Sequence, residues 1–290
     1  MHDLNFTIKK ITDRNRDGSQ GTQANRARIL SQAATQLWRE LGYRHLKDVH
    51  ELKGRHINAL LTTWREEDLS PGTLKNRMAA LRWLADKIGR PGIVSNSNRH
   101  YAIPDRQYAT NEQKAKNLDE RQLDQVKDEY VRMSLELQRV FGLRREEAMK
   151  IQPQYADRGN RLVLKASWTK GGRPREIPVR TQRQRDALDR ARTLAGKGSL
   201  IPPSRNYKQH MKIYERHTSA AGLSKMHGLR HAYAQERYRE LTGWAAPAAG
   251  GPTKNQLSRA QKVTDREARL TISRELGHER EQITAVYCGR

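Results

Sequence analysis

Between positions 21 and 100, apolar residues recur every three or four positions, the spacing of one face of an α-helix. The first run is Leu30, Ala33, Ala34, Leu37, Trp38 and Leu41, and the second is Ile57, Leu60, Leu61 and Trp64. A third begins at Ser70-Pro71, where serine can cap a helix and proline suits its first position. The pattern predicts a small helical bundle over residues 21–100. Residues 1–20 lack this period, and we expect a flexible, weakly basic lead-in.

The pattern changes twice in the rest of the chain. Residues 90–117 contain Arg90-Pro91-Gly92, a Ser/Asn run and Pro104, so we place an interdomain linker at 101–117. Residues 118–290 begin with helical spacing, alternate like a strand over 161–168, and return as a second strand over 176–179 after a Gly-rich turn. Helical segments follow near 182–195, 205–220, 228–240 and 264–287. The sequence predicts a mainly α fold with a small β-hairpin, and a mobile loop over the Ala/Gly/Pro-rich residues 241–256.

Composition and charge narrow the function. The chain has 290 residues with 56 Lys plus Arg against 32 Asp plus Glu, a formal net charge of +24. Such an excess repels itself unless an anion neutralises it, and nucleic acid is the expected partner. No apolar run is long enough to span a membrane, and the N-terminus lacks an apolar signal core, so we expect a cytoplasmic protein. The lone Cys288 excludes a disulfide framework and a cysteine-rich zinc site.

Four short segments occur in a fixed order in the second half. They are Gly142-Leu143-Arg144-Arg145-Glu146-Glu147, Thr169-Lys170 followed by Arg175-Glu176-Ile177-Pro178-Val179, His227-Gly228-Leu229-Arg230-His231, and Leu276-Gly277-His278 with Tyr287 nine positions later. In this order they resemble the motifs of the tyrosine recombinase (phage integrase) family. The resemblance covers residues 118–287. It implies a catalytic domain at 118–290 and a helical core-DNA-binding domain at 21–100.

The resemblance also implies the catalytic set, which is Arg144, Lys170, His227, Arg230, His278 and Tyr287. Elementary chemistry supports it, because cutting a phosphodiester needs a nucleophile, neutralised phosphate oxygens and an acid for the departing oxygen. Arg144 and Arg230 can each present paired N–H groups to a phosphate. Tyr287 would attack phosphorus and release a 5′-hydroxyl. We find no acidic cluster to hold Mg²⁺, and we expect no metal and no cofactor.

The remaining roles concern protons. Lys170, at a Gly-rich turn, is placed to protonate the leaving oxygen, and Lys165 is its main rival. His227 would assist proton transfer, and His278 would hydrogen-bond the phosphate. A solvated hairpin tip or a capping histidine is the ordinary alternative for Lys170 or His227 taken alone.

Three neighbours of these residues are expected to take no part in the chemistry. His231 is predicted to support packing rather than chemistry. Glu147 is predicted to orient the helix behind Arg144, and Cys288 is expected to have no role.

The sequence therefore predicts a site-specific DNA recombinase or integrase that works through a 3′-phosphotyrosine intermediate. The expected partners are double-stranded DNA, three further copies of the chain and an accessory DNA-bending protein. An inactive DNA-binding protein is one alternative, and a suicide substrate distinguishes it because only the enzyme becomes attached to DNA. A type IB topoisomerase is the other, and a two-site plasmid assay separates them.

Two features depart from the family pattern. The interval between Arg230 and His278 is long, and the excess coincides with residues 241–256, either an inert insertion or an extra contact to DNA or a subunit. Only Cys288-Gly289-Arg290 follow Tyr287, which leaves little to dock on a neighbouring subunit.

Overall fold

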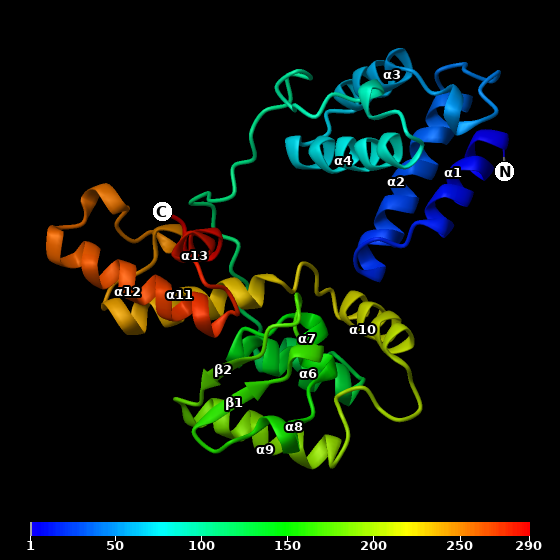
Figure 1. Cartoon of the computed structure of the whole chain (residues 1–290). Coiled ribbons are helices and arrows are strands. Elements are labelled where there is room, and N and C mark those ends of the chain that lie inside the picture. The colour runs from blue at the N-terminus through cyan, green and yellow to red at the C-terminus, as the bar shows by residue number, and fades with distance from the viewer. Residues whose placement is uncertain (1) are drawn as a thin grey trace. The chain divides into compact units, whose positions relative to one another are not determined.

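Figure 1 shows the computed structural model, which describes residues 2–290. The chain divides into two compact units, Met1–Gln107 and Tyr108–Arg290. The division falls inside the segment predicted as a linker. The described residues are mostly helical, with a two-stranded antiparallel sheet in the second unit. This architecture confirms the predicted fold class.

The first unit is a helical bundle. Its elements are α1 (Asp3–Arg14), α2 (Gln20–Arg39), η1 (Val49–Glu51), α3 (Gly54–Glu66), α4 (Pro71–Lys87) and η2 (Pro91–Ile93). Trp64 is buried in its core and donates its indole N–H to Oε1 of Gln36 at 2.8 Å. Ser70 caps α4 by accepting a hydrogen bond from the backbone N–H of Thr73 at 3.3 Å, as the sequence predicts.

The expectation of a flexible lead-in is wrong for the residues that form α1. This helix packs on α2 and buries Leu4 and Ile8, which are four positions apart and therefore share a face. His2 caps it by accepting from the backbone N–H of Asn5. The helix spans only 12 residues, and charged residues interrupt its apolar positions, so its period is weak in the sequence.

The second unit holds the predicted motifs. Its elements are α5 (Glu120–Asp124), α6 (Glu129–Phe141), α7 (Arg145–Lys150), α8 (Pro153–Ala156), β1 (Arg161–Leu164), η3 (Ala166–Trp168), β2 (Arg175–Pro178), α9 (Gln182–Ala195), α10 (Tyr207–Ala220), α11 (Gly228–Thr242), η4 (Pro247–Ala249), η5 (Lys254–Gln256), α12 (Arg259–Glu275) and α13 (Glu281–Cys288). The strands β1 and β2 form the predicted hairpin, and α8 and α9 lie beside it (Figure 1). Helices α11, α12 and α13 pack against one another, and α11 also packs on α6.

The Ala/Gly/Pro-rich stretch is not the exposed mobile loop that its composition suggested. It contains the short helices η4 and η5, and Ala246, Pro247 and Ala248 are buried. Small side chains let this segment lie close against α13, with which η4 is in contact.

Across residues 2–290, no helix is both long and apolar enough to cross a membrane.

Candidate active site

The first arginine motif is built on a sharp turn. Gly142 ends α6 in the left-handed conformation (φ +61°), and a Cβ there would lie 2.6 Å from Cδ1 of Tyr233. The chain then reverses into α7, whose N-cap is Arg144. Glu147 accepts both from the backbone N–H of Arg144 and from its Nη1, each at 2.7 Å. Glu147 therefore fixes the backbone and the side chain of Arg144, in agreement with its predicted structural role.

Arg230 lies near the start of α11 and is almost completely buried, with 1% of its surface exposed. Its Nη1 donates to the carbonyl of Gly142 at 2.5 Å, and its Nη2 donates to the carbonyl of Leu276. Gly142 follows α6 and Leu276 follows α12, so Arg230 links α11 to the ends of both helices. Burial lowers the pKa of Arg230 to about 10, which still leaves the guanidinium charged at neutral pH.

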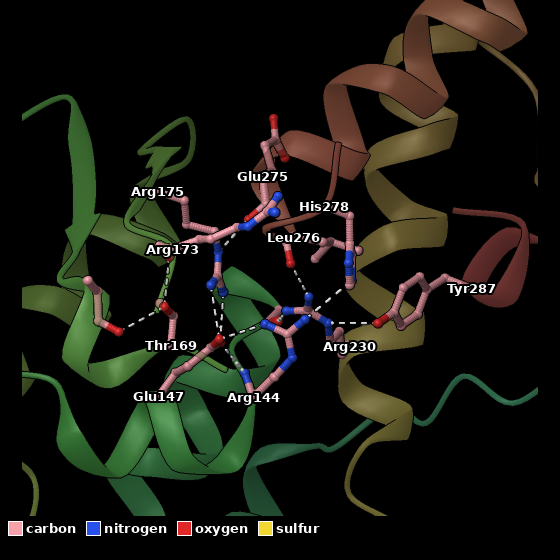
Figure 2. A network of polar contacts seen from close by, with 12 residues as sticks. Arg144, Glu147, Thr169, Arg173, Arg175, Arg230, Glu275, Leu276, His278 and Tyr287 are labelled. Atoms are coloured by element: carbon pink, nitrogen blue, oxygen red, sulfur yellow. Dashed lines mark hydrogen bonds and ion pairs between the residues drawn. The ribbon is translucent and has the colours of Figure 1, made fainter. Parts of the chain in front are cut away.

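Tyr287 lies in the last turn of α13, and its hydroxyl points at Arg230 (Figure 2). Nε of Arg230 donates to this hydroxyl at 3.2 Å. The Tyr287 ring centroid lies 6.1 Å from that of His227, 5.0 Å from His231 and 6.4 Å from His278. Arg144 joins this group through His278, because its Nη2 donates to Nε2 of His278 at 3.2 Å. Residues more than 140 positions apart in the sequence thus form one cluster beside Tyr287.

All three histidines favour the neutral state. Burial and the charges of Arg230 and Arg144 lower the pKa of His278 to about 4. Partial burial and the same two charges lower the pKa of His227, whose side chain remains accessible to solvent. Burial and the neighbouring His227 lower the pKa of His231 to about 4, and His231 packs on the Tyr287 ring, in keeping with its predicted packing role.

Lys170 lies at the exposed turn between η3 and β2, and the structure does not bring it to the cluster around Tyr287. The turn itself is ordered by Thr169, whose hydroxyl contacts the carbonyls of Ala166 at 3.1 Å and Arg173 at 2.7 Å. The rival Lys165 is held elsewhere, because its Nζ lies 3.8 Å from the centroid of the Tyr155 ring. The geometry therefore favours Lys170 over Lys165 as the free lysine of the hairpin.

Arg175 is a site residue that the sequence reasoning missed. It lies in β2 and is 8% exposed, and it donates from Nη1 and Nη2 to the two carboxylate oxygens of Glu147 at 2.9 and 2.7 Å. Its Nε donates to the carbonyl of Glu275 at 2.9 Å (Figure 2). The available signal was strand alternation, which places Arg175 on the same inward face as Ile177. An inward arginine needs a buried acid as its partner.

The charge balance around Glu147 is strongly basic. Burial alone would raise the pKa of Glu147, but the hydrogen bond from Arg175 and the charges of Arg175, Arg144 and Arg230 lower it to about 2. A single buried carboxylate therefore faces three guanidinium groups. The site has an excess of positive charge that a phosphate could neutralise. Within residues 2–290, we find no group of three or more His, Cys, Asp or Glu side chains arranged to hold a metal ion.

Two family models match the chain. A phage integrase N-terminal model matches residues 1–94, and an integrase model matches residues 92–236. The chain belongs to the phage integrase family of tyrosine recombinases. It is a site-specific recombinase that acts on DNA. The second match includes Arg144, Lys170, His227 and Arg230 and ends before His278 and Tyr287.

Solved structures of recombinases share the fold of this integrase. A lambda integrase dimer bound to a core site has 15% sequence identity and a TM-score of 0.62, and the match covers 98% of this chain and 76% of that one. A XerH recombinase bound to its difH substrate has 17% identity and a TM-score of 0.58, covering 98% and 80%. The Tn1549 transposon integrase with circular-intermediate DNA has 13% identity and a TM-score of 0.58, covering 100% and 96%. A search of curated protein sequences gives no match.

Proposed function

We propose that this integrase cuts and rejoins duplex DNA through a 3′-phosphotyrosine bond at Tyr287. The observation that carries the proposal is the contact between the Tyr287 hydroxyl and Nε of Arg230 at 3.2 Å. The hydroxyl of a core tyrosine needs only a neutral hydrogen-bond partner, whereas the partner here is a buried guanidinium. The hydroxyl instead lies at the centre of a positively charged cluster, where an attacking oxygen is needed.

The two arginines supply the phosphate site. A guanidinium has five N–H donors, and Arg230 uses three of them within the protein while Arg144 uses two. The donors that remain can bind the non-bridging oxygens of the scissile phosphate. His278, already hydrogen-bonded to Arg144, lies beside them as a further phosphate ligand.

The Tyr287 oxygen forms a bond to phosphorus while the bond from phosphorus to the 5′-oxygen breaks. The phenol proton passes to a neutral imidazole, for which we propose His227, and Lys170 protonates the departing 5′-oxygen. Because the phosphodiester energy is kept in the phosphotyrosine bond, attack by a second 5′-hydroxyl reverses the step without a nucleotide cofactor.

Lys170 must approach the DNA for this role. It lies in a turn with Gly171 and Gly172, both at positive φ, and its side chain is exposed. An exposed lysine on a glycine-rich turn can reach a ligand that lies over the site. We propose that the hairpin closes on the phosphate when DNA is bound.

The assembly is also a proposal. We infer that four copies act on two DNA segments, and one similar solved structure is a lambda integrase tetramer on a Holliday junction. An accessory DNA-bending protein is a further proposed partner, and we propose that the protein acts in the cytoplasm.

A suicide substrate tests the proposal. A nick close to the cleavage site lets the short 5′-hydroxyl strand diffuse away, so that any covalent protein–DNA complex accumulates. The wild-type protein should accumulate this complex, and Tyr287→Phe should bind DNA within a few-fold but form none. Covalent complex at normal yield with Tyr287→Phe would refute the assignment. Absence of complex with wild type would favour an inactive DNA-binding protein.

A further inference from the structure

Helix α13, which carries Tyr287, is too short to hold itself in place. It has eight residues, and helices of this length are unstable without tertiary contacts. The position of the Tyr287 hydroxyl therefore depends on what holds α13. Arg230 holds the Tyr287 hydroxyl, and the backbone at the C-terminal end of α13 must be held by other residues.

A buried network of hydrogen bonds reaches the backbone just after Tyr287. Arg269 of α12 donates from Nη1 to the carbonyl of Gly289 at 2.9 Å, two residues after Tyr287. Its Nε donates to Oδ1 of Asp265 at 2.7 Å, and the same oxygen accepts from the hydroxyl of Tyr238 at 2.5 Å. Arg269 and Asp265 are 5% and 8% exposed, and Tyr238 is fully buried.

A second support comes from the residues that the sequence marked as an insertion. Gly289 has a φ of +74°, and a Cβ built on it would lie 2.7 Å from the backbone nitrogen of Ala248 and 2.5 Å from Oδ1 of Asn111. Ala248 belongs to η4, which is buried against α13. Only glycine can approach this surface so closely while keeping that backbone conformation.

We propose that Arg269, held by Asp265 and Tyr238, is a positioning residue for the nucleophile. By fixing the Gly289 carbonyl against α12 and η4, it keeps the Tyr287 hydroxyl at Arg230. Its partners lie within the same unit of the same chain, so the tyrosine is aimed without help from a neighbouring subunit. The inference rests on the proposed role of Tyr287 as the nucleophile.

The size of the effect follows from geometry. A misplacement of about 1 Å in a reacting group can reduce a rate about 100-fold. Removing the Arg269 guanidinium releases the end of α13 but leaves Arg144, Arg230 and the DNA-contacting surface in place. Cleavage should therefore fall far more than DNA binding.

The experiment measures single-turnover cleavage of the suicide substrate and DNA dissociation constants for Arg269→Met. The cleavage rate constant should fall about 30- to 100-fold, with the dissociation constant within about threefold of wild type. Asp265→Asn keeps an oxygen that can accept from Arg269 and Tyr238, so it should cleave much faster than Asp265→Leu. This rescue by the conservative variant would not be expected if only the packing volume mattered.

Arg205→Met is the matched control. Arg205 pairs with Asp128 at 2.6 Å in the same unit, and the pair lies outside the α12–α13 contact. The Arg205→Met variant shows how much cleavage is lost when an Arg–Asp pair is removed elsewhere in the unit. Its cleavage rate constant should stay near that of the wild type. A cleavage loss for Arg205→Met equal to that for Arg269→Met would overturn the proposal, because general destabilisation would then explain both.

Gly289→Ala provides a second route if Arg269→Met does not fold. The added methyl group meets Ala248 and Asn111 at the C-terminal end of α13 and leaves the Arg269 network unchanged in sequence. Slow cleavage by folded Gly289→Ala supports the proposal, and a wild-type rate for either variant overturns it. The failure of the proposed function has a different signature, which is covalent complex formed by Tyr287→Phe.

Discussion

Replacing each active-site arginine by lysine should separate catalysis from stability. Lysine keeps the positive charge but loses the planar pair of donors that matches a phosphate. Such preorganised donors each stabilise a transition state by roughly 3–4 kcal/mol. Cleavage should therefore fall at least about 100-fold for both Arg230→Lys and Arg144→Lys.

The two variants should differ in stability. Arg230 is 1% exposed and donates through three separate nitrogens to the carbonyls of Gly142 and Leu276 and to the Tyr287 hydroxyl, a spread that the single nitrogen of lysine does not reproduce. A buried acceptor without a donor costs about 1–3 kcal/mol, and the loss of the bond to Tyr287 adds to it, so we expect about 2–4 kcal/mol in total. Arg144 has a side chain that is 19% exposed, and lysine could still pair with Glu147. We expect Arg144→Lys to change the free energy of unfolding by less than about 1 kcal/mol.

The assay combines single-turnover cleavage of the suicide substrate with urea unfolding of the free protein. DNA affinity should change little in either variant, because many other phosphate contacts remain. Cleavage near the wild-type rate in both variants would show that these arginines are ordinary cations. Equal losses of unfolding free energy would show that the burial of Arg230 has no energetic consequence.

Four further outcomes are expected. Lys170→Ala should cleave ordinary DNA about 100-fold or more slowly, yet recover its rate on a 5′-bridging phosphorothiolate substrate, because a thiolate leaves without an acid. Equal rates on both substrates would show that another residue is the general acid. EDTA should not change the cleavage rate of the wild-type protein. A mixture of Tyr287→Phe and Arg230→Lys proteins should form no covalent complex, because one chain supplies both groups; restored cleavage would show that a neighbour donates the tyrosine. Burial and the neighbouring His227 lower the pKa of His231 to about 4, so the folded protein disfavours protonation of this ring. The free energy of unfolding should therefore be highest above pH 6.5 and fall by about 2–3 kcal/mol as the pH falls toward 4. Urea unfolding of His231→Gln should show a weaker loss over the same range.

Motif-bearing segments were predictable from the sequence because their signals are local. The cap at Ser70-Pro71, the alternation of the hairpin and the periodic helices depend on neighbours within a few positions. The structure confirms the start of α4 at Pro71 and the bounds of α9, and it confirms the hairpin, although β1 ends at Leu164 and the predicted strand residues 166–168 form η3 instead. The motif order also indicated which side chains would meet, and the structure brings Arg144, Arg230, His278 and Tyr287 together.

What the sequence did not predict depends on partners far along the chain. Strand alternation places Arg175 inward, but its role depends on its contact with Glu147, 28 positions away. The 241–256 stretch has the composition of a loop, yet Ala248 packs on the residue that follows Cys288. Small residues permit either outcome, and only the surface available on α13 decides between them.

The electrostatics of the free site indicate how DNA binding and proton transfer are linked. Burial, together with the charges of Arg144 and Arg230, lowers the pKa values of His227 and His278. A phosphate placed between the arginines adds negative charge at the same point and opposes their effect on both rings. In the proposed mechanism, the histidines therefore become stronger bases when the substrate is bound, which is when the phenol proton leaves Tyr287. On this proposal, the arginines that keep the histidines neutral in the free protein also bind the phosphate whose charge raises the basicity of His227, the proposed acceptor of the Tyr287 proton.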